Sequence, residues 1–289
     1  MIILCQVPSL LGMEKRTIGV LMEYDPLKDR AASLIRVWPA ARVFFYRVLD
    51  LLLLRQRYVK LALRQYLPTD RGFRYYDAGA GFCQYSWHVL KNYPAAKVFA
   101  NDLKRDYLED FSRYAKKSFP GRFSWLQADL QTFTPRHSYD LTTAIDILEH
   151  IQDDGAVLRN FNAALADGGI LIISTPSDTD EAAKFTSEHV RPGYNKAELE
   201  DKLCACGFTI LESIYSYGTW GSLAWRLLLK HPLKLIARSK LILLALPMYY
   251  LLIFPLAELL MRLDLKSSNP TGTGIIIVAQ KRFSSEPDR

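Results

Sequence analysis

The sequence predicts an α/β fold, with a mostly parallel sheet and helices on both of its faces. From about residue 72 to residue 215, short apolar runs alternate with helix-like stretches, which is the pattern of a parallel sheet. The run "GILIIST" at 169–175 is almost uniformly apolar and β-forming, as expected of a strand buried on both faces. The 289 residues can form one such core with a substantial embellishment.

The elements follow from this pattern in order. Strands are expected at 73–77, 97–102, 123–129, 139–146 and 169–175, with helices at 84–92, 105–118 and 154–166. A further helix at 196–206 has Asn195 as its N-cap and Gly207 just past its end. Two more strands begin at residues 208 and 274, and between them lie residues 217–272, which are unlike the rest of the chain.

The stretch "YYDAGAGFCQY", residues 75–85, contains the first indication of a ligand site. Gly79 and Gly81 let the backbone turn tightly out of a strand and aim amide groups at a ligand. The dinucleotide fingerprint needs a third glycine where Gln84 stands, which disfavours a nicotinamide enzyme. The Asp77 carboxylate also suits a cationic ligand better than a pyrophosphate. S-adenosylmethionine is such a ligand, because it has a sulfonium, an ammonium and a ribose.

Two further carboxylates fit the same ligand. Asp102 ends the second strand candidate, 21 residues after Gly81, where it can accept hydrogen bonds from both ribose hydroxyls. Asp129 ends the third candidate and could receive the adenine amino group, with Leu130 packing nearby. The carboxyl ends of neighbouring parallel strands converge on the crevice where open sheets bind ligands. Each acid alone is also an ordinary turn or cap residue.

In this order the motifs resemble those of the class I S-adenosylmethionine-dependent methyltransferases, the broad group that includes the quinone-biosynthesis enzymes. The resemblance covers roughly residues 72–215 and the final strand, through "DAGAG", "ANDL", "LQADL", "YDLTTAIDILEHI", "LRNFNAALADGGILIISTPS" and "HVRPGYNKAELEDKLCACGF". It implies a Rossmann-like seven-stranded, mostly parallel sheet with a reversed last strand. Cys83 stands where the family often has a third glycine, and we expect altered packing there rather than lost binding. The implied S-adenosylmethionine-binding residues are Asp77, Gly79, Gly81, Asp102, Asp129, Leu130 and Asp146.

The candidate catalytic residues come from two later segments. Glu149 and His150 follow the fourth strand, near the place where the methyl group would be presented. Methyl transfer from a sulfonium is an in-line displacement, so positioning contributes most and a general base helps only a protonated acceptor. His150 could be that base, because imidazole titrates near neutral pH, or it could orient the loop.

The second segment covers the acceptor pocket in the resembled family. It contains His189, a second candidate catalytic residue, and Arg191 and Tyr194, the candidate substrate-binding residues. Arg191 could pair with an acidic acceptor or a phosphate head group. The alternative is that these residues only fix the loop to the sheet.

Residues 217–272 contain "LILLALPMYYLLIFPLAELLM", an apolar run of 21 residues that is long enough to suggest a transmembrane helix. We expect Pro232, Pro247 and Pro255 to divide the region into pieces of at most about 14 residues. The flanking strands should also pair in one sheet, which puts both ends of the insertion on one side. Interfacial helices or an apolar lid are therefore expected, attracted to anionic lipid by Arg226, Lys230, Lys234, Arg238 and Lys240.

In the N-terminal region, residues 34–67 mix long apolar side chains with basic residues that only Asp50 opposes. Alone it would be a soluble helical cap packed on the domain, but two such segments together favour membrane association. Nucleic acid is disfavoured because the basic residues are interleaved with Leu, Ile and Phe. The net charge of +7 agrees with an anionic partner. The basic residues are Arg36, Arg42, Arg47, Arg55, Arg57, Lys60 and Arg64.

The chain is expected to divide into an N-terminal helical region (1–70), a methyltransferase core (71–216), an apolar insertion (217–272) and a final strand with a tail (273–289). Four cysteines without disulfide or zinc spacing indicate a reducing compartment and no metal. The expected function is methyl transfer to an oxygen or carbon of a lipophilic acceptor, such as a quinone, an aromatic lipid or a lipid-linked glycan. The expected place is the cytoplasmic face of the cell membrane. The alternatives are a soluble small-molecule methyltransferase with an apolar homodimer interface, and a non-catalytic cofactor-binding membrane scaffold.

Overall fold

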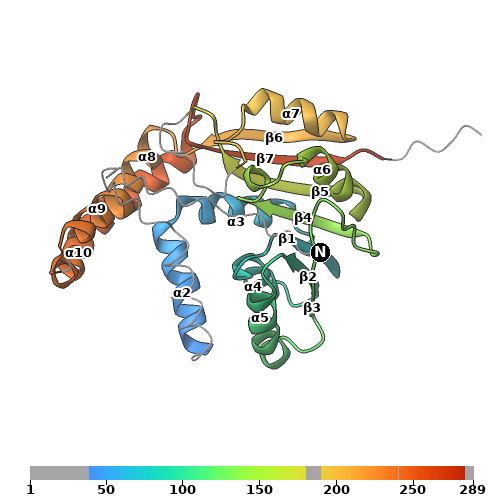
Figure 1. Ribbon diagram of the computed structural model, residues 1–289, viewed down its shortest axis with the longest axis horizontal. Helices are drawn as coiled ribbons and strands as arrows, with labels where there is room; N and C mark the ends of the chain where they lie inside the picture. The colour runs from blue at the N-terminus through green and yellow to red at the C-terminus, as the bar shows by residue number, and fades with distance from the viewer. Residues whose placement is uncertain (1–38, 180–189, 240, 284–289) are drawn as a thin grey trace, which may run out of the picture.

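The computed structural model describes residues 39–179, 190–239 and 241–283. Its centre is a seven-stranded sheet in the order β3-β2-β1-β4-β5-β7-β6, with helices on both faces (Figure 1). Strand β7 pairs antiparallel with β5 and β6, and the other pairs are parallel. The predicted sheet with a reversed last strand is therefore confirmed. The strands are β1 (Phe73–Ala78), β2 (Ala96–Asp102), β3 (Phe123–Gln127), β4 (Tyr139–Ile145), β5 (Leu165–Pro176), β6 (Phe208–Ser216) and β7 (Gly274–Lys281).

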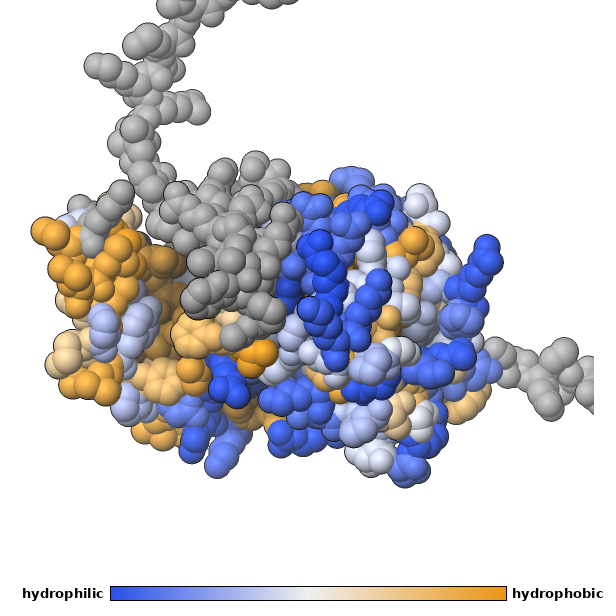
Figure 2. Space-filling model, turned by 90° about the horizontal axis from the view of Figure 1, so that it is seen from below, coloured by the Kyte–Doolittle hydropathy of each residue, from blue (hydrophilic) through white to orange (hydrophobic). Residues whose placement is uncertain are grey.

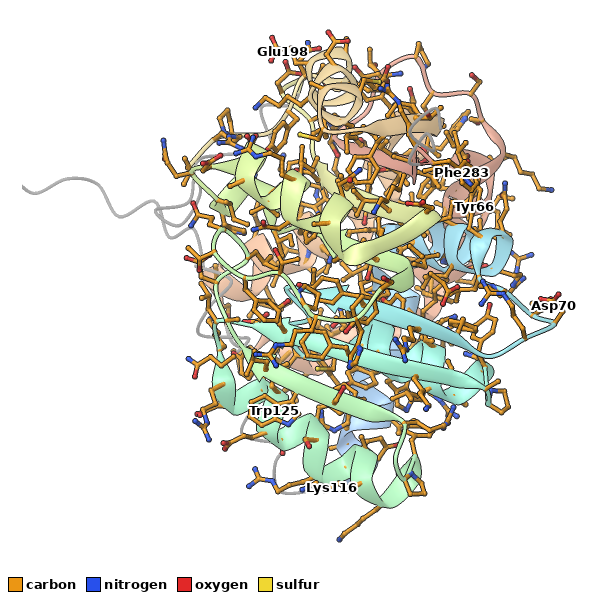
Figure 3. The ribbon with its side chains drawn as sticks, turned by 90° about the vertical axis from the view of Figure 1, so that its right-hand side faces the viewer. Tyr66, Asp70, Lys116, Trp125, Glu198 and Phe283 are labelled. Atoms are coloured by element: carbon orange, nitrogen blue, oxygen red, sulfur yellow. The ribbon has the colours of Figure 1, made fainter. Side chains whose placement is uncertain are left out.

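The helices between the strands lie close to their predicted positions. Helices α4 (Gln84–Asn92) and α5 (Arg105–Ser118) have the predicted bounds. Helix α6 (Asp154–Ala164) ends two residues earlier than predicted, because Leu165 already pairs with Tyr139 of β4. Helix α7 (Lys196–Ala205) begins where Asn195 accepts two backbone N–H bonds. In Figure 3, Trp125 of the edge strand β3 lies toward one end of the sheet and Glu198 of α7 toward the other.

The central strands of the sheet are buried on both faces, as the apolar run at 169–175 predicted. In β7, Ile276 and Val278 belong to the apolar cluster that includes residues of α3, α4 and α5. Ile275 and Ile277 belong to the cluster with α6 and α7. Successive side chains of a strand point to opposite faces, so one uninterrupted apolar strand supplies both layers of the core.

The N-terminal helices pack on this domain. They are α2 (Pro39–Leu52) and α3 (Leu54–Tyr66), and α3 contacts β5 and β7. Several of the basic side chains in these helices pair within the chain rather than standing free in solvent. Arg42 pairs with Asp110 of α5, and Arg57 pairs with Glu258 at 2.6 Å. Helices α2 and α3 pack on the domain as the helical-cap alternative describes, but Arg42 and Arg57 form ion pairs instead of being solvated as that alternative expects.

The insertion forms α8 (Thr219–Trp225), the π-helical turn η2 (Arg226–Lys230), α9 (His231–Arg238) and α10 (Ile242–Lys266). The prediction that prolines divide it into short pieces was wrong, because Pro247 and Pro255 both lie inside the 25-residue α10. Pro232 lies in the first turn of α9, directly after the π-helical turn η2, so its missing N–H interrupts the hydrogen-bond pattern of a continuous helical run. An interior proline costs about 3 kcal/mol in a helix, so packing must hold α10 together.

Contacts at two places fix α10. The hydroxyls of Tyr249 and Tyr250 donate to backbone carbonyls of η2, at 2.8 and 2.9 Å. Near the other end, the fully buried Asp264 accepts hydrogen bonds from the Tyr58 hydroxyl of α3 (2.8 Å) and the Gly221 N–H of α8 (2.9 Å). Asp264 therefore joins three helices that are far apart in the sequence.

We predict that Asp264→Ala lowers the free energy of unfolding by about 2–4 kcal/mol, because it removes the carboxylate that accepts the Tyr58 hydroxyl and leaves the Gly221 N–H without that buried partner. Urea denaturation measures the loss. Glu258→Ala is the matched control on the same helix, and it should cost about 1 kcal/mol or less because its ion pairs are partly exposed. Equal losses in the two variants would contradict the assignment.

Candidate functional site

The glycine turn after β1 provides two different surfaces. Gly79 (φ +66°) lies against the loop that follows β4, and a Cβ at this position would be 2.4 Å from Ile147 Cγ2. Gly81 has φ +50°, and no atom of the described residues would lie within 4 Å of its Cβ. Gly79 is therefore required for packing, whereas Gly81 presents bare backbone to open space, where a ligand can approach closely.

Cys83 occupies a left-handed backbone conformation at the N-cap of α4, with φ 58°. Such a conformation favours glycine, which explains why a third glycine is common at this point of the resembled motif. The Cys83 N–H donates to the Ala80 carbonyl at 2.7 Å, and the side chain is fully buried. Burial also raises the pKa of the thiol. The turn thus closes around a small, protonated cysteine.

Asp77 lies under the first turn of α4. Its carboxylate accepts the Ser86 N–H (3.0 Å), the Ser86 hydroxyl (2.6 Å) and the Thr143 hydroxyl (3.3 Å). Burial raises the pKa of Asp77 to about 6 against the opposing effect of these donors. The contacts with Ser86 show that Asp77 caps helix α4. A contact between Asp77 and a cationic ligand remains a prediction.

Asp102, the last residue of β2, turns its carboxylate onto the glycine loop. It accepts the Gly81 N–H and the Lys104 N–H, each at 2.8 Å. The predicted convergence of this acid with the glycine turn is therefore present.

Asp129 lies two residues beyond the end of β3, which corrects the prediction that it ends the strand. It accepts the Gln131 N–H at 2.9 Å. The neighbouring Leu130 is buried.

The loop after β4 contains the next three candidates. Asp146 has φ 50°, accepts the Ser174 hydroxyl at 3.3 Å and forms an ion pair with Arg55. Glu149 is buried and accepts the Thr175 hydroxyl at 3.1 Å, and burial raises its pKa. The His150 side chain is exposed on the short 3₁₀ turn η1 (Leu148–His150), where an acceptor could reach it.

Arg191 and Tyr194 converge on Asp154, at the start of α6. The Asp154 carboxylate lies 2.7 Å from Arg191 Nη1 and 2.9 Å from the Tyr194 hydroxyl. Both side chains also donate to the Leu148 carbonyl. These contacts fix the segment to η1 and α6, and a contact with a substrate remains a prediction. His189 lies outside the described residues.

Arg55 is the residue that sequence reasoning missed at this site. It was grouped with the basic residues of the N-terminal region, yet its side chain pairs with Asp146 beyond β4. No local pattern distinguishes it from the neighbouring arginines, because its partner lies about ninety residues away in the sequence.

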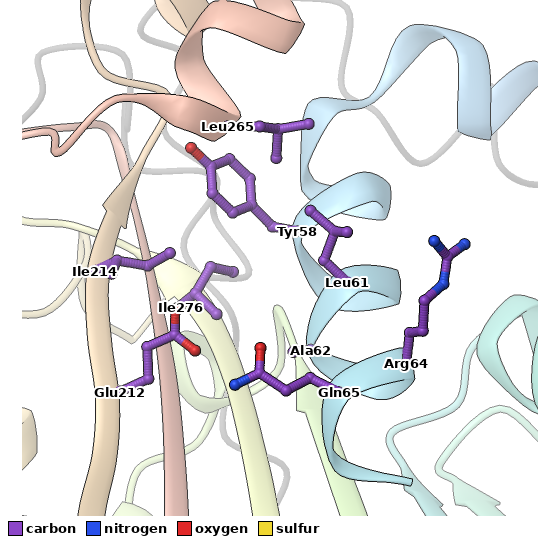
Figure 4. Close-up of a pocket in the computed structure, with 9 residues that line it drawn as sticks. All are labelled: Tyr58, Leu61, Ala62, Arg64, Gln65, Glu212, Ile214, Leu265 and Ile276. Atoms are coloured by element: carbon purple, nitrogen blue, oxygen red, sulfur yellow. The ribbon is translucent and has the colours of Figure 1, made fainter. Parts of the chain in front are cut away.

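A separate cavity of about 340 Å³ lies between α3, α10 and the β6–β7 pair (Figure 4). Glu212 and Ile214 line it from the middle of β6, and Tyr58 and Leu61 line it from α3. Its lining includes none of the candidate site residues. The candidate site residues lie instead at the carboxyl ends of β1, β2 and β4, the end at which open parallel sheets bind ligands.

Comparison with known proteins agrees with that location. Residues 76–171 match the family described as "Methyltransferase domain". Trans-aconitate 2-methyltransferase from Azoarcus sp. is 28% identical over 40% of this chain and 44% of that protein. A second protein of this name, from Rhizobium etli, is 26% identical over 47% of this chain and 52% of that protein. The matched region spans about half the length of these curated relatives.

Solved structures share the fold at lower identity. Haemonchus contortus phosphoethanolamine N-methyltransferase 2 in complex with S-adenosyl-L-methionine has a TM-score of 0.54 at 18% identity, covering 76% of this chain and 51% of that one. The [4+2]-cyclase SpnF also has a TM-score of 0.54 at 18% identity, covering 79% and 81%. Because a cyclase shares the fold, the fold alone does not define the chemistry.

The residues of the crevice fit S-adenosylmethionine as the cofactor, which the domain match also supports. The Asp102 carboxylate lies beside the Gly81 N–H, where an acid can accept bonds from ribose hydroxyls. The open space at Gly81 admits a ligand against the backbone. These two observations support the cofactor independently of the sequence motif.

We predict that Gly81→Ala weakens binding of S-adenosylhomocysteine about tenfold or more, because its methyl group fills the space through which the ligand approaches. Calorimetric titration measures this. The matched control is Gly121→Ala, because Gly121 also has a positive φ (+71°) and no described atom within 4 Å of a Cβ. Both variants should lose about 1–2 kcal/mol of stability through backbone strain. Unchanged binding by Gly81→Ala would place the ligand elsewhere.

We also predict a pH-dependent effect of Asp77→Asn. Because the pKa of Asp77 is raised from 3.8 to about 6, the folded state binds this proton more tightly than the unfolded state. The stabilisation of the folded state by the proton on Asp77 is complete below about pH 4, and it is lost as the pH rises through 6. Relative to that of the parent, the free energy of unfolding of the variant should therefore rise by ~1–3 kcal/mol between pH 4 and pH 7.

Urea denaturation at several pH values measures this gain. The control is Asp140→Asn, which changes a partly exposed carboxylate on the neighbouring strand β4. If the stability difference between Asp77→Asn and the parent were constant across this range, the carboxylate would not be perturbed as described.

Proposed function

We propose that this chain, which carries a class I S-adenosylmethionine-dependent methyltransferase domain, transfers a methyl group to an oxygen or carbon of a lipophilic acceptor at a membrane surface. The observation that supports the lipophilic acceptor and the membrane together is the exposed apolar surface of α10. A quinone, an aromatic lipid or a lipid-linked glycan would each suit such a surface. A cytoplasmic, membrane-peripheral location is part of this proposal.

The crevice supports methyl transfer by positioning. S-adenosylmethionine supplies an electrophilic methyl group. In-line displacement depends chiefly on how the reactants are oriented, and Asp102 and the glycine turn provide a rigid surface for orientation. His150, exposed on η1, can accept a proton from a protonated acceptor. Glu149, buried beneath it and bonded to Thr175, holds the loop in place.

Helix α10 has the surface expected of a lipid-contacting element. Among the described residues it is the one helix that is long and apolar enough to span a membrane, and only 6% of its most apolar window is buried. Hydrophobic residues gather at the end of the molecule where α10 lies (Figure 2). Monomeric soluble proteins rarely expose so continuous an apolar patch. The most exposed members are Leu241, Leu244, Met248, Leu251 and Leu252, each 61–82% exposed.

The packing of α10 favours a helix lying in the interface over one that crosses the bilayer. Its C-terminal part is buried at Ala257, Leu260, Met261 and Asp264. The remaining part, residues 242–254, spans about 20 Å at 1.5 Å per residue, whereas a bilayer core is about 30 Å thick. The adjacent cations Arg226, Lys230 and Lys234 suit contact with anionic lipid.

A soluble acceptor is the main rival. The curated relatives are named trans-aconitate 2-methyltransferases, and in that case the apolar surface of α10 would be a contact between two copies of the chain. The two functions place the methylated product in different solvents, so one experiment separates them.

The test supplies isotopically methyl-labelled S-adenosylmethionine with anionic vesicles made from a total lipid extract, and separately with a water-soluble metabolite extract. We expect label in the lipid phase. The variant Leu244→Asp/Leu251→Asp/Leu252→Asp should lose vesicle co-sedimentation and about tenfold or more of the lipid labelling, because charges oppose insertion into lipid. Its binding of S-adenosylhomocysteine should be unchanged.

The control is Leu103→Asp/Leu126→Asp, which alters exposed leucines of the loop after β2 and of the edge strand β3. It should retain both co-sedimentation and labelling. Label confined to the water-soluble extract would support the soluble rival, and bound cofactor with no labelled product would support a non-catalytic scaffold.

A further inference from the structure

The cavity between α3, α10 and the β6–β7 pair has a mostly apolar wall. Its volume of about 340 Å³ exceeds the ~150 Å³ that accommodates a benzene molecule in a protein interior. At ~30 Å³ for each water-sized group, the space holds roughly eleven non-hydrogen atoms. A ligand that fills this cavity must therefore be small and largely hydrophobic. The apolar wall consists of Tyr58, Leu61, Ala62, Ile214, Leu265 and Ile276.

A β-bulge places the carboxylate of Glu212 on the same side of the sheet. Ile210 pairs with Ala279 and Glu212 pairs with Val278, so the register shifts across Leu211. Ala279 belongs to the apolar cluster with α6 and α7, whereas Val278 belongs to the cluster with α3. Strict alternation would have put Glu212 on the face of Ile210. The bulge instead turns this carboxylate toward α3, which is a common effect of bulges.

The charge of Glu212 is not compensated within the cavity. Glu212 forms no ion pair with any of the cationic side chains that the structure describes. Arg64 also lines the cavity, but Figure 4 shows its guanidinium on the other side of α3 from Glu212. Burial lowers the pKa of His88 in α4 to about 4, and the charge of Arg64 contributes to this effect. Arg64 therefore faces α4 rather than Glu212.

We propose that this cavity binds a small lipophilic amine in its protonated form, with the ammonium at Glu212 and the hydrocarbon body against the apolar wall. A cation stabilises a carboxylate that lies beside apolar surface, because it replaces part of the lost hydration. The hydrocarbon body contributes by leaving water. A fatty acid or a phosphate ester of the same size is disfavoured, because its anionic head would meet a like charge. This site goes beyond the proposed function, and it is separate from the crevice.

The test uses three probes with the same aromatic body and different heads, which are 4-phenylbutylamine, 4-phenylbutanol and 4-phenylbutyrate. Calorimetric titration of the full chain should show that the amine binds about tenfold more tightly than the alcohol, as expected of a hydrogen bond to a charged group. The butyrate should bind more weakly than either. In Glu212→Gln, the affinity for the amine should fall to within about twofold of that for the alcohol.

A second variant, Ala62→Leu, locates the bound probe. Its larger side chain fills part of the cavity, so it should weaken binding of the amine and the alcohol alike by about tenfold. A cooperative urea transition checks that this variant is folded. Unchanged binding of the amine by folded Ala62→Leu would place the ligand elsewhere and overturn the inference.

The matched control for the charge is Glu200→Gln. The Glu200 carboxylate of α7 accepts the hydroxyl of Ser213, the residue after Glu212 in β6, at 2.6 Å. Because Ser213 pairs with Ile277, which belongs to the cluster with α6 and α7, this control removes a charge from the opposite face of the same strand. It should keep the preference of the parent for the amine. Equal binding of the amine and the alcohol by the parent, no binding of any probe, or a preference that persists in Glu212→Gln would each overturn the inference.

Discussion

The pairing of β7 between β5 and β6 constrains the rest of this molecule. Because β7 runs antiparallel to both neighbours, the chain leaves β6 at Ser216 and re-enters the sheet at Gly274 on the same side. The insertion as a whole must therefore begin and end near the carboxyl ends of the parallel strands. The crevice that binds ligands in open parallel sheets lies at that end, so the topology alone places the apolar helices beside the candidate site.

Helix α3 connects these two parts. Near its start, Arg55 pairs with Asp146 at the crevice. One turn later, Arg57 and Tyr58 contact Glu258 and Asp264 of α10. Because α3 contacts both Asp146 and α10, the position of α10 depends on the same helix that contributes Arg55 to the site. The buried Asp264 strengthens this dependence, because its partners lose their hydrogen bonds if α10 moves away.

The sequence predicted the central sheet well because its information there is local. The strands and the bounds of α4 and α5 follow from hydrophobic periodicity and flanking turns, and the glycine turn identifies the crevice. The missed features depend on distant contacts. Arg55 and Arg42 find carboxylates on other helices and loops, which no spacing rule reveals. The continuity of α10 through Pro247 and Pro255 depends on its packing against η2, α3 and α8.

These internal ion pairs also change the physical basis of the proposed membrane attraction. The sequence suggested electrostatic attraction from both basic segments, but Arg42, Arg55 and Arg57 are neutralised within the fold. Exposed cations near α10, such as Arg226 and Lys234, remain to face a lipid head group. Burial of exposed apolar area contributes about 25 cal/mol per Å² and is not screened by salt, whereas a surface charge is. Attraction of this protein to a bilayer would therefore come mainly from the leucines of α10, with charge setting the orientation.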